Sequence, residues 1–222
     1  LQHSIDLLNG KELAELVNEE MYNADPSRTD YMKSLSDPVS IGKGYNMLNA
    51  LKRTGFYQKH NLSLNGGSKN AHFRINGNYS SDQPTFIKED NQNFGLQFIS
   101  DFVIGKFKFG ETFMIKRTNR DWSNKNVLVS LQWSPTMPFY DPNHPTGFMG
   151  AGNGTTCSNP LAEAHLNWNK TETTLINGNA WAIYEILPGL NYKLNLGVDY
   201  YNTMTQNYDG DYVIVYLTHS PD

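Results

Sequence analysis

The stretch NGNAWAIYEILPGLNYKLNLGVDYYNTMTQN, residues 177–207, decides the fold of this chain. From residue 190 to residue 200 the odd positions carry polar side chains or glycine, whereas the even positions are apolar or aromatic: Leu190, Tyr192, Leu194, Leu196, Val198 and Tyr200. Because successive strand residues point to opposite faces, this alternation predicts a β-strand with one apolar and one polar face. Pro188 and Gly189 before it predict a tight turn, and hence a hairpin. Soluble strands commonly run about five or six residues, so a strand this long suits a wall between lipid and water.

Four further strands follow from the same alternation. They are predicted at 58–66, 72–80, 94–104 and 107–116, and weaker patterns predict strands at 127–133 and 212–217. One helix is predicted at residues 9–22, because Asn9 can cap it, Glu12 stands at its third position and apolar residues recur on one side.

The connections between these strands alternate in length. The reversals at 66–70, 105–106 and 188–189 are short, and those at 81–91, 120–173 and 206–211 are longer and more polar. Outer-membrane barrels place their short turns at one rim and their long loops at the other. We therefore predict an all-β, antiparallel up-and-down meander that forms part of a large transmembrane β-barrel, with one short N-terminal helix and long outer loops.

This fold divides the chain into four segments. Residues 1–55 form an outer loop with the short helix, and 56–119 form two barrel hairpins. A long extracellular loop follows at 120–174, and a barrel hairpin with the start of the next outer segment occupies 175–222. Because the chain begins at Leu1 and ends after a strand-like run, we expect it to be a piece of a longer protein.

Composition excludes several classes of function. The chain has 222 residues, 38% of them hydrophobic and 13% aromatic, with a formal net charge of −4 and no basic cluster that would bind nucleic acid. No run of about 18 apolar residues predicts a membrane helix. Cys157 is the single cysteine, and the histidines are too widely spaced for a metal site. We expect neither a cofactor nor a catalytic set, and therefore no enzyme.

Two groups of residues are candidates for binding. Polar residues on the non-apolar side of the strands are predicted to face a wet lumen: Arg74, Asn76, Asn78, Gln97, Asn195 and Asp199. Their neutral amides match sugar hydroxyls or peptide groups, although exposure to bulk solvent would produce the same pattern. Aromatic residues of the long loop are candidates for stacking on substrate or on a partner, and equally for fastening the loop to itself: Trp122, Trp133, Tyr140, Phe148 and Trp168.

Several segments together resemble one family. They are Asp6-Leu7-Leu8-Asn9 with the following helix, the run RTGFYQKHNLSLNGGS at 53–68, PTMPFYDP at 135–142, NPLA at 159–162, and residues 180–200. In this order they resemble the SusC/RagA family of TonB-dependent outer-membrane transporters of the Bacteroidetes type. Residues 84–86, Pro-Thr-Phe, depart from the family's pattern, which has a glycine-containing turn here.

The resemblance implies a plugged barrel in the cell outer membrane that imports glycans or peptides. It implies a SusD-like lipoprotein as partner, TonB as the source of energy through a part of the protein outside this sequence, and contact with outer-membrane lipid. The alternative is a soluble all-β carbohydrate-binding module. That module would need its even-position residues packed against a second sheet.

Overall fold

The computed structural model describes residues 6–27, 37–123, 128–150 and 157–210. The chain forms two compact units. Leu1–Lys52, Ser123–Trp168 and Asp209–Asp222 make up the loop unit, and Arg53–Trp122 with Asn169–Tyr208 make up the sheet unit.

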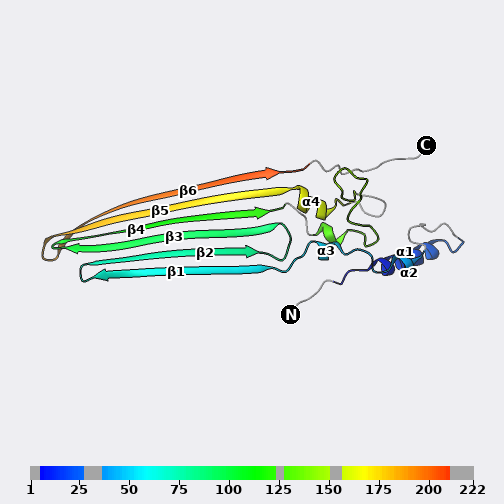
Figure 1. Ribbon diagram of the computed structural model, residues 1–222, viewed down its shortest axis with the longest axis horizontal. Helices are drawn as coiled ribbons and strands as arrows, with labels where there is room; N and C mark the ends of the chain where they lie inside the picture. The colour runs from blue at the N-terminus through cyan, green and yellow to red at the C-terminus, as the bar shows by residue number, and fades with distance from the viewer. Residues whose placement is uncertain (1–5, 28–36, 124–127, 151–156, 211–222) are drawn as a thin grey trace. The chain divides into compact units, whose positions relative to one another are not determined.

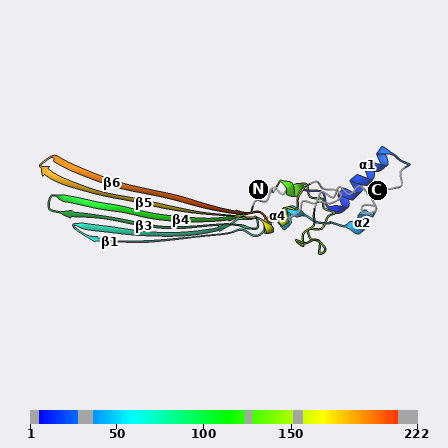
Figure 2. The same cartoon turned by 90° about the horizontal axis from the view of Figure 1, so that it is seen from above.

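The sheet unit is one antiparallel meander. Its strands are β1 (Phe56–Ser68), β2 (Ala71–Gln83), β3 (Glu89–Ile104), β4 (Phe107–Trp122), β5 (Trp168–Leu187) and β6 (Leu190–Tyr208), and they pair in sequence order. Figure 1 shows the short turns after β1, β3 and β5 at the same end of the sheet, and Figure 2 shows the strands again in one layer. Among the described residues the sheet is not closed, because β1 and β6 are its two edges. The predicted all-β antiparallel meander with one short N-terminal helix is confirmed.

The strands are longer than predicted, so two of the polar connections are shorter and the third begins later. The β2–β3 connection is residues 84–88 instead of 81–91, the β4–β5 connection begins at 123 and ends at 167, and β6 continues to Tyr208. Arg53 organises the first of these connections, because its backbone amide donates to the Thr85 carbonyl (2.6 Å) and its side chain donates to the Pro84 carbonyl (3.1 Å).

The strand predicted at 127–133 is wrong. From Leu128 onward this segment turns, and Val129–Leu131 form the 3₁₀ helix η1. The physical reason is that β4 pairs directly with β5 along its whole length, which leaves no strand edge between them for this segment to join. The strand predicted at 212–217 lies outside the described residues.

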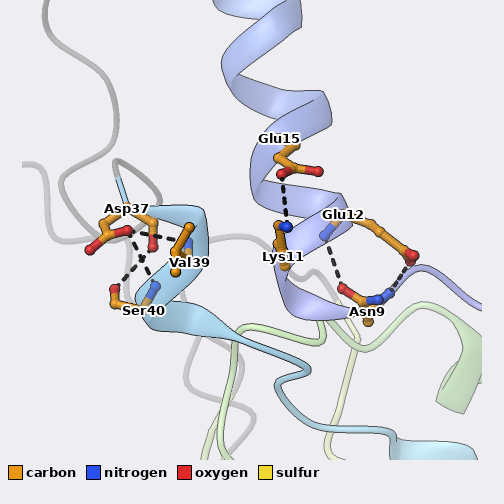
Figure 3. Close-up of polar contacts among 7 residues, drawn as sticks. All are labelled: Asn9, Lys11, Glu12, Glu15, Asp37, Val39 and Ser40. Atoms are coloured by element: carbon orange, nitrogen blue, oxygen red, sulfur yellow. Dashed lines mark hydrogen bonds and ion pairs between the residues drawn. The ribbon is translucent and has the colours of Figure 1, made fainter.

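The loop unit contains the helices. They are α1 (Gly10–Ala24), α2 (Pro38–Ile41), α3 (Met47–Ala50) and α4 (Pro160–Leu166), in addition to η1. The helix predicted at 9–22 is confirmed as α1, including the reciprocal cap in which Glu12 N donates to Asn9 Oδ1 and Asn9 N donates to the Glu12 carboxylate (Figure 3). Asp37 caps α2 in the same view. Among the described residues, no helix has the length and apolar character needed to cross a membrane.

The two units differ in where apolar side chains go. Within the described residues, every buried hydrophobic residue belongs to the loop unit: Ala14, Met47, Leu48, Leu51, Trp133, Met137, Cys157, Leu161, Ala162 and Ala164. The sheet unit has no buried hydrophobic residue among those described, and its large apolar side chains are partly or fully exposed. The loop unit therefore has an interior, and the described sheet has two surfaces.

Candidate functional site

One face of the sheet is an almost continuous apolar surface. Strand pairing aligns Leu64 with Ile75, Ile75 with Phe98, and Phe98 with Phe113, so their side chains share this face. Farther along the same face Val198 lies against Gly178, where an added Cβ would be 2.9 Å from its side chain. We call this surface the apolar face.

Aromatic rings stack on the apolar face near the short turns. Phe102 and Phe109 stack with ring centroids 5.2 Å apart, and Phe107 and Tyr184 stack at 4.5 Å. The next pair on this face, farther from the short turn, is polar: the Ser100 hydroxyl donates to the Glu111 carboxylate at 3.3 Å.

The opposite face carries polar side chains that bond across strands. In one row the Ser63 hydroxyl donates to Asn76 Oδ1, and Asn76 Nδ2 donates to Gln97 Oε1 at 3.0 Å. The same pairing direction continues on β5 and β6, where Asn177 donates to Asp199. We call this surface the polar face.

A second row of the polar face lies nearer the polar connections. The Thr118 hydroxyl donates to Asn93 Oδ1 at 2.8 Å, and Asn93 Nδ2 donates to the Ser80 hydroxyl at 3.4 Å. On the next strands Thr173 and Thr203 pair through their hydroxyls at 3.2 Å. Amides and hydroxyls both donate and accept hydrogen bonds, so this surface is able to exchange bonds with a polar solute at many points.

The six residues predicted to face a lumen share the polar face. Arg74, Asn76 and Asn78 alternate along β2, and Gln97 lies opposite Asn76. Asn195 and Asp199 occupy odd positions of β6, on the side of the Asp199 bond to Asn177. Sequence reasoning found these positions but missed the bonds between them.

A hydrogen bond between a histidine and a carboxylate on the polar face was also missed. His72 Nδ1 lies 3.0 Å from Asp101 Oδ2, and both side chains are about half exposed. Part of the signal was present in the sequence, because a two-residue turn at Lys69-Asn70 fixes which residues of β1 and β2 face each other. The second turn, at Gly105-Lys106, does the same for β3 and β4. The predicted β2–β3 connection was too long, so the pairing of His72 with Asp101 did not emerge from the sequence.

The aromatic candidates have different surroundings. Trp133 is buried, and its indole nitrogen donates to the Met137 carbonyl at 3.2 Å, which fastens the loop unit to itself. Tyr140 is 56% exposed and lies 5.4 Å from Phe148, ring to ring.

The other two aromatic candidates lie at strand ends. The Arg120 guanidinium lies over the Trp122 ring at 5.2 Å, near the end of β4. Trp168 is 37% exposed at the start of β5. Of the loop-unit rings among the five candidates, Tyr140 and Trp168 therefore present the most open surface to a ligand.

No metal centre is evident in the described part of the chain, where no three His, Cys, Asp or Glu side chains are grouped to hold an ion. The arrangement is instead a long two-faced sheet joined to a compact loop unit with its own core.

Comparisons with known proteins agree with this architecture. No protein-family model matches the chain. TonB-dependent receptor P3 of Formosa agariphila is 24% identical over 220 residues, covering 91% of this chain and 20% of that protein. TonB-dependent receptor SusC of Bacteroides thetaiotaomicron is 25% identical over 176 residues, covering 67% of this chain and 17% of that protein. The chain thus spans about a fifth of the length of these curated relatives.

Two solved structures share the fold. The RagAB peptide importer in its closed-closed state matches with a TM-score of 0.60 and 17% identity over 89% of this chain and 24% of that one. The RagAB peptide transporter matches with a TM-score of 0.60 and 19% identity over 87% of this chain and 23% of that one. The chain is therefore similar to a segment of the SusC/RagA type of TonB-dependent receptor, and the proteins it resembles are receptors and importers by name, not enzymes.

Proposed function

We propose that this chain is part of the wall and outer loops of a TonB-dependent importer in the cell outer membrane. In this proposal it transports glycans or peptides without chemical transformation and works with a SusD-like lipoprotein. Contact with TonB is made by another part of the protein.

The observation that carries the proposal is the sheet with no interior. A sheet in a soluble sandwich buries one face against a second layer, and the described residues form only one sheet. Leu196 and Val198 are 62% and 60% exposed on the apolar face. Exposed apolar surface on this scale marks a membrane or protein contact, and the polar connections at one end of the strands favour a membrane.

The height of the apolar face supports the same assignment. On β3 the apolar positions run from Phe94 to Ile104. Ten steps at about 3.3 Å give about 33 Å along the strand, or about 25 Å along the membrane normal for a strand tilted by about 40°. That is the height of the apolar band of outer-membrane barrels, roughly 25 Å.

The outer edges of β1 and β6 have no neighbouring strand among the described residues. Each of these strands has one described neighbour in the sheet, so its other side presents backbone N–H and C=O groups. Hydrocarbon offers these groups no partner, and each unsatisfied group costs several kcal/mol. A membrane location therefore requires further strands on both sides, as in a chain about five times as long.

In this assignment the polar face lines the passage, with Arg74, Asn76, Asn78, Gln97, Asn195 and Asp199 facing the solute. Segments 1–55 and 120–174 lie on the outer side, with Tyr140, Phe148 and Trp168 available for the substrate or the lipoprotein. Trp122 closes the outer end of β4. Trp133 is buried in the core of the loop unit.

Spin labels placed one at a time at Val198 and Asn195 in the intact protein, reconstituted in phospholipid vesicles, test the two-faced wall. We expect oxygen, which concentrates in lipid, to relax the label at 198, and a water-soluble nickel chelate to relax the label at 195. Equal relaxation of both labels by both agents would contradict the proposal and favour a soluble binding module.

A further inference from the structure

The loop unit contains a cavity of about 410 Å³ that the wall function does not use. Three separate segments line it: residues 6–8 with Leu13 around the start of α1, residues 45–47 before and within α3, and residues 130–135 around η1. This volume lies in the range of about 300–1,000 Å³ found for small-molecule sites.

The walls of the cavity are fixed by backbone bonds. Gly10 N donates to the Lys43 carbonyl at 2.9 Å, and Lys11 N donates to the Gly42 carbonyl at 2.8 Å, which ties the start of α1 to the second segment. The reciprocal cap of α1 in Figure 3 orders the same turn. The cavity therefore does not depend on a ligand to bring its first two walls together.

The third wall is held by a close approach that requires glycine. Tyr45 N donates to the Pro135 carbonyl at 2.7 Å. Gly44 beside it has φ +62°, and an added Cβ would lie 2.0 Å from the Pro135 oxygen. Trp133 is anchored in this wall by its bond to the Met137 carbonyl. Preformed walls reduce the entropy that a ligand loses on binding.

The polar groups of the lining differ in whether they already have a hydrogen-bond or charged partner. Asn46 Oδ1 already accepts from Asn49 N, and the Ser134 hydroxyl pairs with Thr136. Asp6 is the one charged residue of the lining, and among the described residues no cation pairs with its carboxylate. Tyr45 is 44% exposed, and the edge-to-face contact of its ring with Phe139, at 5.2 Å, holds its orientation.

We propose that this cavity binds the ammonium group at the amino terminus of a short peptide. A carboxylate forms charge-assisted hydrogen bonds with an ammonium group, and an aromatic ring in the same cavity attracts a cation. Because no lysine or arginine lines the cavity, an anionic ligand gains no partner there and is repelled by Asp6. This inference rests on the proposed importer function and narrows its substrate class to peptides.

The test is calorimetric binding to the intact protein in detergent at neutral pH. The probes are tetra-alanine with a free amino terminus, the same peptide with an acetylated amino terminus, and maltotriose. Asp6 is exposed, and an exposed ion pair contributes little, so we expect the free peptide to bind about two- to fivefold more tightly than the acetylated one. Asp6→Asn removes the charge at nearly constant shape and should abolish this preference, whereas Asp6→Glu should retain part of it.

Glu15→Gln is the matched control, because Glu15 pairs with Lys11 on the exposed side of α1 at 3.5 Å, outside the cavity lining (Figure 3). It should leave the preference unchanged. Trp133 fluorescence and near-ultraviolet circular dichroism should be the same in all variants, which confirms that the cavity is intact. Equal binding of the free and acetylated peptides, no binding of the free peptide, or maltotriose binding that depends on Asp6 would each overturn the inference.

Uptake by cells separates this inference from the proposed function. If deletion of the gene abolishes uptake of a nutrient while acetylation has no effect on binding, the importer function stands and the ammonium site is wrong. If the spin labels at Val198 and Asn195 behave alike, the importer function itself fails, whatever the calorimetry gives.

Discussion

Placing an arginine on either face of β6 gives the most direct energetic test of the two-faced sheet. Leu194 and Asn195 are neighbours on this strand and point to opposite faces. Leu194→Arg puts a charge on the apolar face, and Asn195→Arg puts the same charge on the polar face at the same depth.

The depth follows from the strand geometry. Leu194 lies five residues beyond the turn at Gly189, which is about 16 Å along the strand and about 13 Å along the normal at a tilt of about 40°. Half of a band of roughly 25 Å is about the same distance, so the proposed membrane wall places Leu194 near the bilayer midplane. An arginine facing lipid at the midplane costs about 2–4 kcal/mol, whereas an arginine facing water changes stability by no more than about 0.5 kcal/mol.

The measurement is the free energy of unfolding of the intact protein in phospholipid vesicles, from urea titrations followed by tryptophan fluorescence. We expect a loss of about 2–4 kcal/mol for Leu194→Arg and a change within about 0.5 kcal/mol for Asn195→Arg. Equal losses for both variants, or a larger loss for Asn195→Arg, would refute the assignment of the two faces.

Two further predictions concern the loop unit. Gly44→Ala should destabilise it more than Gly42→Ala. Both residues have φ +62°, but only at Gly44 would the new Cβ collide, 2.0 Å from the Pro135 oxygen. Thermal melts should separate the stabilities of the two variants by more than about 1 kcal/mol, and equal melts would contradict the close contact. Trp133→Phe keeps an aromatic ring but removes the indole hydrogen bond to the Met137 carbonyl. Amide hydrogen exchange at residues 129–139 should then report a free energy of local opening lower by about 1–2 kcal/mol. Unchanged exchange would show that this bond does not hold the loop.

Alternation predicted the strands well because it is a local signal. Phe94 to Ile104 and Leu190 to Tyr200 show their faces without reference to any other part of the chain. The strand ends were missed for the opposite reason. Asn169 to Thr173 are polar at every position, and they extend β5 because they bond to the backbone of β4, which no pattern within the segment reveals.

The cavity of the loop unit lay beyond sequence reasoning. Its third wall depends on Gly44 meeting Pro135, residues that are far apart in the chain and belong to segments without any periodicity. The strand predicted at 127–133 failed in the same region, since Trp133 is buried among loop residues instead of alternating along a sheet. Long-range packing decided the structure here, and composition gave only the expectation of turns.

The low hydrophobic content of the chain follows from the sheet having no interior. A soluble domain needs apolar residues for a core, whereas a wall between lipid and water needs them at every second strand position only. The loop unit, which has a core, concentrates its buried residues in α3, η1, α4 and their flanks. The sheet unit instead has one apolar face, and on its other face polar side chains form cross-strand hydrogen bonds such as that from Asn76 to Gln97. If the proposed membrane wall is right, removal of lipid should expose the apolar face to water and destabilise the sheet unit. The loop unit buries its own apolar side chains and should have no such dependence.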